Sequence, residues 1–116
     1  MERSIRHHQS GTPSPKSGRS RLVVVVPAGI ADSSTLLRVL AERLRCPDWF
    51  GGNWNALSDC LRDLSWLPQR TVVLWHEDLP PLPLADLELY QELLADSAVS
   101  WTPGDAHRLE ISFPAV

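Results

Sequence analysis

Apolar residues are spaced in two different ways along the chain, and each spacing predicts one kind of element. Short apolar runs rich in β-branched residues, over residues 22–26 and 71–75, are typical of strands buried inside a parallel sheet. Residues 108–113 alternate between apolar and polar side chains, which predicts a last strand at an edge of that sheet. Between these runs, apolar residues recur every three or four positions in three predicted amphipathic helices: residues 33–45, 54–64 and 86–98. The order β, α, α, β, α, β predicts an α/β domain of three layers, in which helices pack on a short, mainly parallel, three-stranded sheet.

The first twenty residues lack this periodicity. They are rich in Ser, Gly, Pro, His and Arg, a composition that buries too little apolar surface to offset the entropy of ordering. We therefore predict a disordered basic tail over residues 1–20 and one folded domain over residues 21–116. A domain of that length can form a core without disulfides or metals.

The formal net charge of −3 combines two segments of opposite sign. Residues 1–21 hold five basic residues and one acidic residue, whereas residues 22–116 carry a net charge of −7. An acidic domain repels nucleic acid and membrane surfaces and attracts basic partners, although the same charge also keeps a protein soluble. The charge therefore disfavours nucleic acid as a partner.

Two further properties of the chain bear on its location. The longest apolar run, residues 22–26, is far shorter than the roughly 18 residues of a membrane span, and the polar N-terminus does not resemble a signal peptide. We therefore expect a cytoplasmic protein that does not enter a membrane. Cys46 and Cys60 are too few for a disulfide framework and are expected to be reduced, with a bridge between them as the alternative.

The segment of residues 47–61 combines an aromatic pair, a glycine turn and the start of a helix. Gly51 and Gly52 can adopt positive φ and interrupt the preceding helix, and Asn53 is a suitable N-cap. The helix that follows turns one apolar stripe toward the core: Trp54, Leu57, Leu61 and Leu64. Its opposite face presents a small polar patch: Asn55, Ser58, Asp59 and Arg62. Trp49 lies in the adjoining loop, where it either contacts a partner or folds back onto the core, so this segment is a candidate recognition surface.

No strong catalytic signature is present. The chain lacks a phosphate-binding loop, Cys or His pairs at zinc spacing, and a dinucleotide fingerprint after its first strand. Cys60, His76 and Asp78 offer a nucleophile, a base and an orienting acid in principle, but Cys60 is expected to face the core. Trp54 and Trp75 occupy positions that predict packing against the core. The sequence therefore predicts a protein without catalysis, cofactor or bound metal.

The residues from Pro47 to Leu61 resemble the signature of the barstar family, intracellular protein inhibitors of secreted bacterial ribonucleases. The family pattern reads Pro, acidic, aromatic, aromatic, Gly, x, Asn, x, Asp, Ala, Leu, x, Asp, Cys, Leu, and this chain matches most of it. The order of the predicted elements agrees as well. The resemblance covers roughly residues 21–113 and leaves the first twenty without a counterpart.

This resemblance implies that the loop and helix over residues 48–62 plug the active site of a ribonuclease. It places the carboxylate of Asp59 where an RNA phosphate would bind, in contact with catalytic arginines and a histidine of the enzyme. A further acidic position on the last helix aligns with Asp96, or alternatively with Glu92. The remaining implied contacts surround Asp59 in the sequence: Trp49, Gly51, Gly52, Asn53, Asn55 and Ser58.

Four positions depart from the family pattern. Asn55 replaces the first aspartate of the helix, and Ser58 replaces an aromatic residue that often precedes the key aspartate. Trp49 stands where the family has a tyrosine, and Arg62 adds a positive charge. The patch is therefore less acidic than that of the prototype, which bears on the choice of nuclease.

Two functions follow as hypotheses. The first is an immunity protein that forms a 1:1 complex as a monomer and occludes the active site of a basic, extracellular-type ribonuclease or a related toxin domain. The second is a non-catalytic interaction or regulatory module on a barstar-like fold that binds a protein other than a nuclease.

Overall fold

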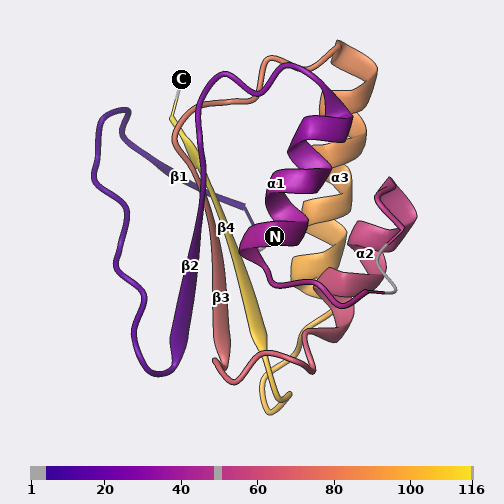
Figure 1. The fold of residues 1–116 in the computed structure, drawn as a ribbon. Helices are drawn as coiled ribbons and strands as arrows, with labels where there is room; N and C mark the ends of the chain where they lie inside the picture. Colours follow the sequence, from indigo (N-terminus) through magenta and orange to yellow (C-terminus); the bar gives the residue numbers. More distant parts are fainter. Residues whose placement is uncertain (1–4, 49–50, 116) are drawn as a thin grey trace.

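The sheet contains four strands that all run parallel, in the order β1–β4–β3–β2 (Figure 1). The computed structural model describes residues 5–48 and 51–115. Its strands are β1 (Ile5–His8), β2 (Arg21–Val26), β3 (Thr71–His76) and β4 (Arg108–Pro114). The predicted α/β architecture with a parallel sheet is confirmed.

The prediction of three strands is wrong, because β1 forms inside the segment predicted as a disordered tail. It pairs with β4 from Ile5 opposite Ile111 to His8 opposite Pro114. As a consequence β4 is an inner strand, not the edge strand that we expected. The sequence did not predict β1, because its four residues include one aliphatic side chain and show no alternation of apolar and polar residues. The strand is held by main-chain pairing with β4, which does not require a particular pattern of side chains.

Three helices follow the predicted segments: α1 (Ser33–Arg43), α2 (Trp54–Asp63) and α3 (Leu84–Val99). Asp32 caps α1, since its carboxylate accepts a hydrogen bond from the Thr35 N–H at 2.9 Å. The side chain of Asn53 caps α2 in the same way, accepting from the Ala56 N–H at 2.8 Å, as the sequence predicted. None of the helices in the described part of the chain could span a membrane.

All three helices lie against one face of the sheet (Figure 1). In β2 the buried side chains alternate with half-buried ones, so that Val24 and Val26 face the helices while Val23 and Val25 face away. We call this second side the outer face. Within the described residues no helix covers it; the segment of residues 9–20 runs beside it instead (Figure 1). The helical third layer that we expected on this side is therefore replaced by a loop.

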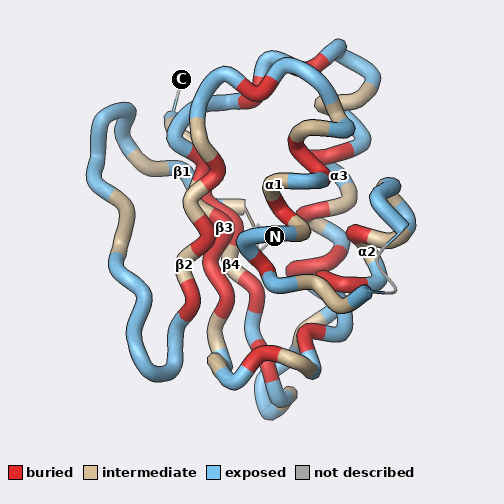
Figure 2. The backbone as a smooth tube through the Cα atoms, viewed as in Figure 1, coloured by how far each residue is buried: buried red, intermediate tan, exposed pale blue. Residues whose placement is uncertain are grey.

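The hydrophobic core fills the space between the helices and the sheet, where the buried residues gather (Figure 2). The three helices and the three longer strands all contribute fully buried side chains to one continuous cluster, among them Val26, Leu36, Leu40, Leu57, Leu61, Leu74, Leu94 and Ile111. A core of this size fixes α2 and its neighbours without a disulfide.

Trp75 lies on the outer face and not in the core, contrary to the prediction. Leu74 faces the helices, so strand alternation turns Trp75 the other way, where it is half-buried. The imidazole of His8 stacks on its indole with ring centroids 3.7 Å apart and an interplanar angle of 9°. His8 also hydrogen-bonds the Ser112 hydroxyl through Nδ1. These contacts hold β1 on a sheet that would otherwise end at β4.

A polar network crosses the core between β3, β4 and α3. His76 is fully buried, its Nδ1 lies 2.9 Å from the Ser112 carbonyl oxygen, and its Nε2 lies 2.7 Å from the Tyr90 hydroxyl. Because a carbonyl only accepts, Nδ1 carries the proton, and Nε2 accepts from the tyrosine. Desolvation on burial lowers the pKa of His76 to about 4. The neutral imidazole thus ties α3 to the sheet.

Candidate protein-binding surface

The candidate surface begins at a turn that starts α2. Gly52 has a φ of 73°, which a residue with a Cβ adopts only with strain, and Asn53 then caps the helix. Asp48, Gly51, Gly52 and Asn53 are all exposed. Trp49, the other predicted contact of this loop, lies outside the described residues. The described part of the loop therefore offers polar and main-chain groups to a partner.

Helix α2 buries one side and exposes the other, as its spacing predicted. Leu57, Cys60 and Leu61 are fully buried, and Trp54 packs against the same core while half-buried. On the opposite side Asn55 and Asp59 are both exposed, one helical turn apart. Ser58 is half-buried and lies at the border of this patch.

The carboxylate of Asp59 is available to a partner. Arg62 lies three residues further along the helix and does not form an ion pair with it, since among the described residues the one side-chain ion pair joins Arg108 to Glu110. An exposed carboxylate keeps its hydration in the free protein and can exchange it for charge-assisted, bidentate hydrogen bonds from an arginine. Asp59 is thus an acidic side chain exposed on this face of α2, followed one turn later by exposed Asp63.

Helix α3 lies beside α2 and supplies the remaining acidic candidates. The rings of Trp54 and Tyr90 are 5.9 Å apart, and the indole N–H of Trp101 donates to the Leu61 carbonyl at 2.9 Å. Asp96 lies on the part of α3 between these two contacts, and Glu92 lies one turn earlier; both are exposed. The structure therefore places both acidic residues on the helix adjacent to α2.

The catalytic triad that the sequence allowed in principle is not assembled. Both ring nitrogens of His76 are engaged inside the core. Cys60 is buried, which raises the pKa of its thiol and suppresses the nucleophilic thiolate. The carboxylate of Asp78 accepts a hydrogen bond from the Leu79 N–H at 2.8 Å and does not orient the histidine. The residues that the structure describes also contain no cluster of side chains suited to a metal ion.

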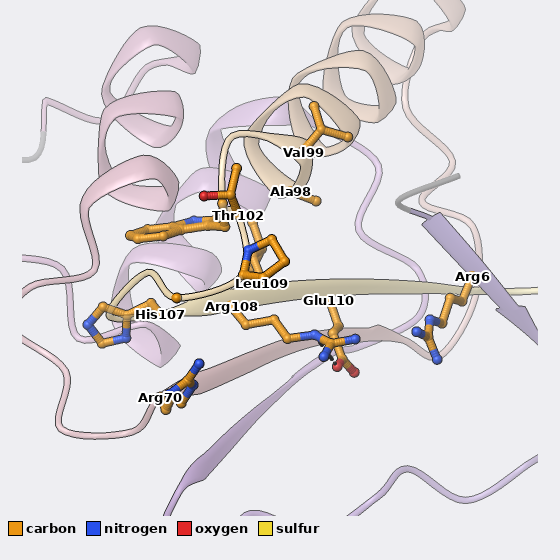
Figure 3. Close-up of a pocket in the computed structure, with 12 residues that line it drawn as sticks. Arg6, Arg70, Ala98, Val99, Thr102, His107, Arg108, Leu109 and Glu110 are labelled. Atoms are coloured by element: carbon orange, nitrogen blue, oxygen red, sulfur yellow. Dashed lines mark ion pairs between the residues drawn. The ribbon is translucent and has the colours of Figure 1, made fainter. Parts of the chain in front are cut away.

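A basic cleft of about 560 Å³, which sequence reasoning missed, lies between the end of α3 and the start of β4 (Figure 3). Arg6, Arg70 and Arg108 line it together with the ring of Trp101. Arg108 is paired with Glu110 at 3.1 Å. No motif could have revealed this cleft, because β1 brings Arg6 to a strand that is about a hundred residues away in sequence.

The part of the chain that forms these elements matches a known family. The model described as Barstar (barnase inhibitor) matches residues 21–113, which run from β2 through all three helices into β4. Comparisons with curated proteins and with solved structures give no match. The matched region contains the whole surface on α2 and α3 and excludes β1. This chain therefore belongs to the barstar family, whose members bind and inhibit ribonucleases such as barnase.

Proposed function

We propose that this protein is a stoichiometric inhibitor, an immunity protein that occludes the active site of a basic ribonuclease or related toxin domain with residues 48–62. The observation that carries the proposal is the exposed Asp59 on α2, a helix within the region that matches the barstar family, whose other side buries Leu57, Cys60 and Leu61 in the core. A carboxylate presented on a rigid helix can occupy a phosphate subsite with little loss of conformational entropy. Binding then blocks the substrate without any turnover by the inhibitor.

The charge of the domain supports a basic partner. Residues 22–116 carry a net charge of −7, and Asp59, Asp96 and Glu92 are exposed on two adjacent helices. Opposite charges accelerate encounter and align the two molecules before contact. We further propose that the protein acts as a monomer in a 1:1 complex in the cytoplasm, without catalytic activity or a cofactor of its own.

The partner differs in detail from the prototype nuclease. Asn55 replaces a carboxylate by a neutral amide, which can donate as well as accept hydrogen bonds. Exposed Arg62 adds a positive charge one turn from Ser58. We therefore propose a cognate enzyme with one less basic subsite facing Asn55, because matched and mismatched charges together set specificity.

The test uses barnase as the probe ribonuclease and compares two variants of the same helix. Asp59→Ala removes the proposed central contact, and Asp63→Ala removes another exposed carboxylate, from the last turn of α2. We expect Asp59→Ala to weaken inhibition by on the order of 2 kcal/mol, which corresponds to an increase of about 30-fold in Ki. This magnitude is the one typical of charged hot-spot residues in protein interfaces, for which barstar itself is a standard example. Asp63→Ala should change Ki by no more than a few-fold, and neither variant should change the urea midpoint strongly.

Two outcomes would count against the proposal. Equal Ki values for Asp59→Ala and the wild type, with both proteins folded, would show that this face of α2 is not the inhibitory surface. If the wild type inhibits neither barnase nor a ribonuclease co-purified from the source cell, the second function is favoured: an interaction module that binds a protein other than a nuclease. The neutral Asn55 and the small Ser58 are the observations that support that alternative.

A further inference from the structure

The basic cleft between the end of α3 and the start of β4 is separate from the proposed binding surface, since none of residues 48–62 lines it. Its volume of about 560 Å³ lies within the range of roughly 300–1,000 Å³ that is typical of sites for small molecules. Three arginines and one glutamate line it, so the lining has an excess of two positive charges. Residues 22–116 as a whole carry a net charge of −7, and the cleft therefore differs in sign from the domain around it.

The cleft forms around an open edge of the sheet. β1 pairs with β4 from Ile111 onward, so that among the described residues no strand lies beside the first three residues of β4 on this side. The Arg108 N–H donates to the Arg70 carbonyl on the β3 side at 2.8 Å. Alternation along the strand therefore turns the next main-chain N–H, that of Leu109, toward the open edge. A main-chain donor at the edge of a basic cleft is suited to a negatively charged ligand.

The arginines reach this edge from three different elements. Arg108 lies on β4, Arg6 on β1, and Arg70 immediately before β3. In Figure 3 the side chain of Arg6 points toward the ion pair of Arg108 with Glu110. Among the described residues, Arg6 and Arg70 form no ion pair of their own. The ion pair of Arg108 is made through Nε at 3.1 Å, which leaves the two terminal nitrogens for the planar, two-bond contact that phosphate oxygens accept.

The wall on the other side of β4 is largely apolar. Figure 3 shows Ala98 and Val99 on the opposite side of β4 from Arg108, and Trp101 also lines the cleft. The indole N–H of Trp101 donates to the Leu61 carbonyl at 2.9 Å, which holds the ring in place. A rigid apolar and aromatic wall opposite a group of arginines suits a ligand that joins a planar, uncharged body to an anionic group.

We propose that this cleft binds a mononucleotide, a phosphate monoester that carries a planar base. The guanidinium groups and the Leu109 N–H bind the phosphate, while the base packs against Trp101. A small ligand fits this site better than a nucleic acid chain, because the acidic domain around the cleft repels a polyanion that extends beyond it. The proposal does not depend on the identity of the protein partner, since the cleft shares no residue with the surface on α2.

One acidic side chain competes with the phosphate. Of the described residues that line the cleft, Glu110 alone is acidic, and it already pairs with Arg108. Asp105 does not compete, because its carboxylate accepts a hydrogen bond from the Thr102 N–H at 2.7 Å. The phosphate therefore has to share Arg108 with Glu110, which limits the affinity of the wild type and makes Glu110 a position at which binding can be improved.

The experiment titrates the full-length protein with AMP by isothermal titration calorimetry at low ionic strength. Adenosine and inorganic phosphate serve as separate probes, because each carries one half of the proposed ligand. We expect saturable 1:1 binding of AMP with a Kd below about 1 mM, and binding at least about tenfold weaker for either half alone. Asp59→Ala should bind AMP like the wild type, which separates this site from the inhibitory surface.

Two variants should change the affinity for AMP in opposite directions. Arg70→Gln removes a guanidinium but keeps the Arg70 carbonyl that accepts from Arg108, and it should raise Kd about tenfold. Glu110→Gln removes the competing carboxylate and should lower Kd. The controls make the same charge changes at exposed residues of α1 and should leave Kd nearly unchanged: Arg38→Gln and Glu42→Gln.

Three results would overturn the proposal. The first is the absence of saturable AMP binding to the wild type and to Glu110→Gln. The second is an affinity for adenosine or inorganic phosphate equal to that for AMP. The third is an equal loss of affinity in Arg70→Gln and Arg38→Gln, which would show that the net charge of the protein and not the cleft determines binding. Urea midpoints close to that of the wild type establish that the variants are folded.

Discussion

Acid should destabilise this protein through His76, the buried imidazole that joins α3 to the sheet. The folded state holds the ring neutral, since burial lowers its pKa from 6.5 to about 4, whereas in the unfolded chain it titrates near 6.5. Below pH 6.5 the unfolded chain therefore binds a proton that the folded protein does not. Stability from this group is complete above pH 6.5 and is lost as the pH falls toward 4.

The size of the effect follows from the difference between the two pKa values. A change from 6.5 to about 4 corresponds to on the order of 3 kcal/mol of unfolding free energy, of which about 2 kcal/mol is lost by pH 5. The ring is fully buried and both its nitrogens are engaged, so that solvent screening does not reduce this figure greatly. A loss of this size is a large fraction of the stability of a small domain.

The measurement is urea unfolding followed by tryptophan fluorescence at pH 7.5 and pH 5, for the wild type, His76→Gln and His7→Gln. Glutamine can donate and accept hydrogen bonds but does not titrate, so the pH-dependent loss in His76→Gln should shrink by about 2 kcal/mol even if the variant is less stable at both pH values. His7→Gln removes an exposed histidine and should keep the wild-type loss. If His76→Gln loses as much stability as the wild type between the two pH values, the acid sensitivity comes from other groups and not from His76.

Two further predictions test local structure. Removing residues 1–8 should lower the unfolding free energy by about 2 kcal/mol, because β1 pairs with β4 and the His8 ring stacks on Trp75. An unchanged urea midpoint would show that β1 does not stay paired with β4. Asn53→Ala should lower the unfolding free energy by about 1 kcal/mol in the same assay, because it removes the N-cap of α2. Asn55→Ala should lower it much less, because Asn55 is exposed and makes no capping hydrogen bond. Equal decreases for the two variants would contradict the capping role of Asn53.

The sequence alone determined the helices, the strands β2 and β3, and the polar face of α2. These depend on local chemistry: the 3.6-residue spacing of leucines, the β-branched runs of β2 and β3, and the capping side chain of Asn53. Each of these preferences acts within a few residues, so it can be read without knowing what lies across the molecule. The exposed Asp59 beside buried Cys60 is a direct result of that spacing.

Only the tertiary structure decided the features that depend on contacts between distant residues. β1 is stabilised by pairing with β4, and Trp75 faces outward because the face of β3 that the helices cover is the one that bears Leu74. The basic cleft at Arg6 likewise arises where chain segments that are distant in sequence meet in space. Such contacts are set by packing and main-chain hydrogen bonds, which do not impose a periodic pattern on the sequence. They could therefore not be predicted from the sequence and are visible only in the folded structure.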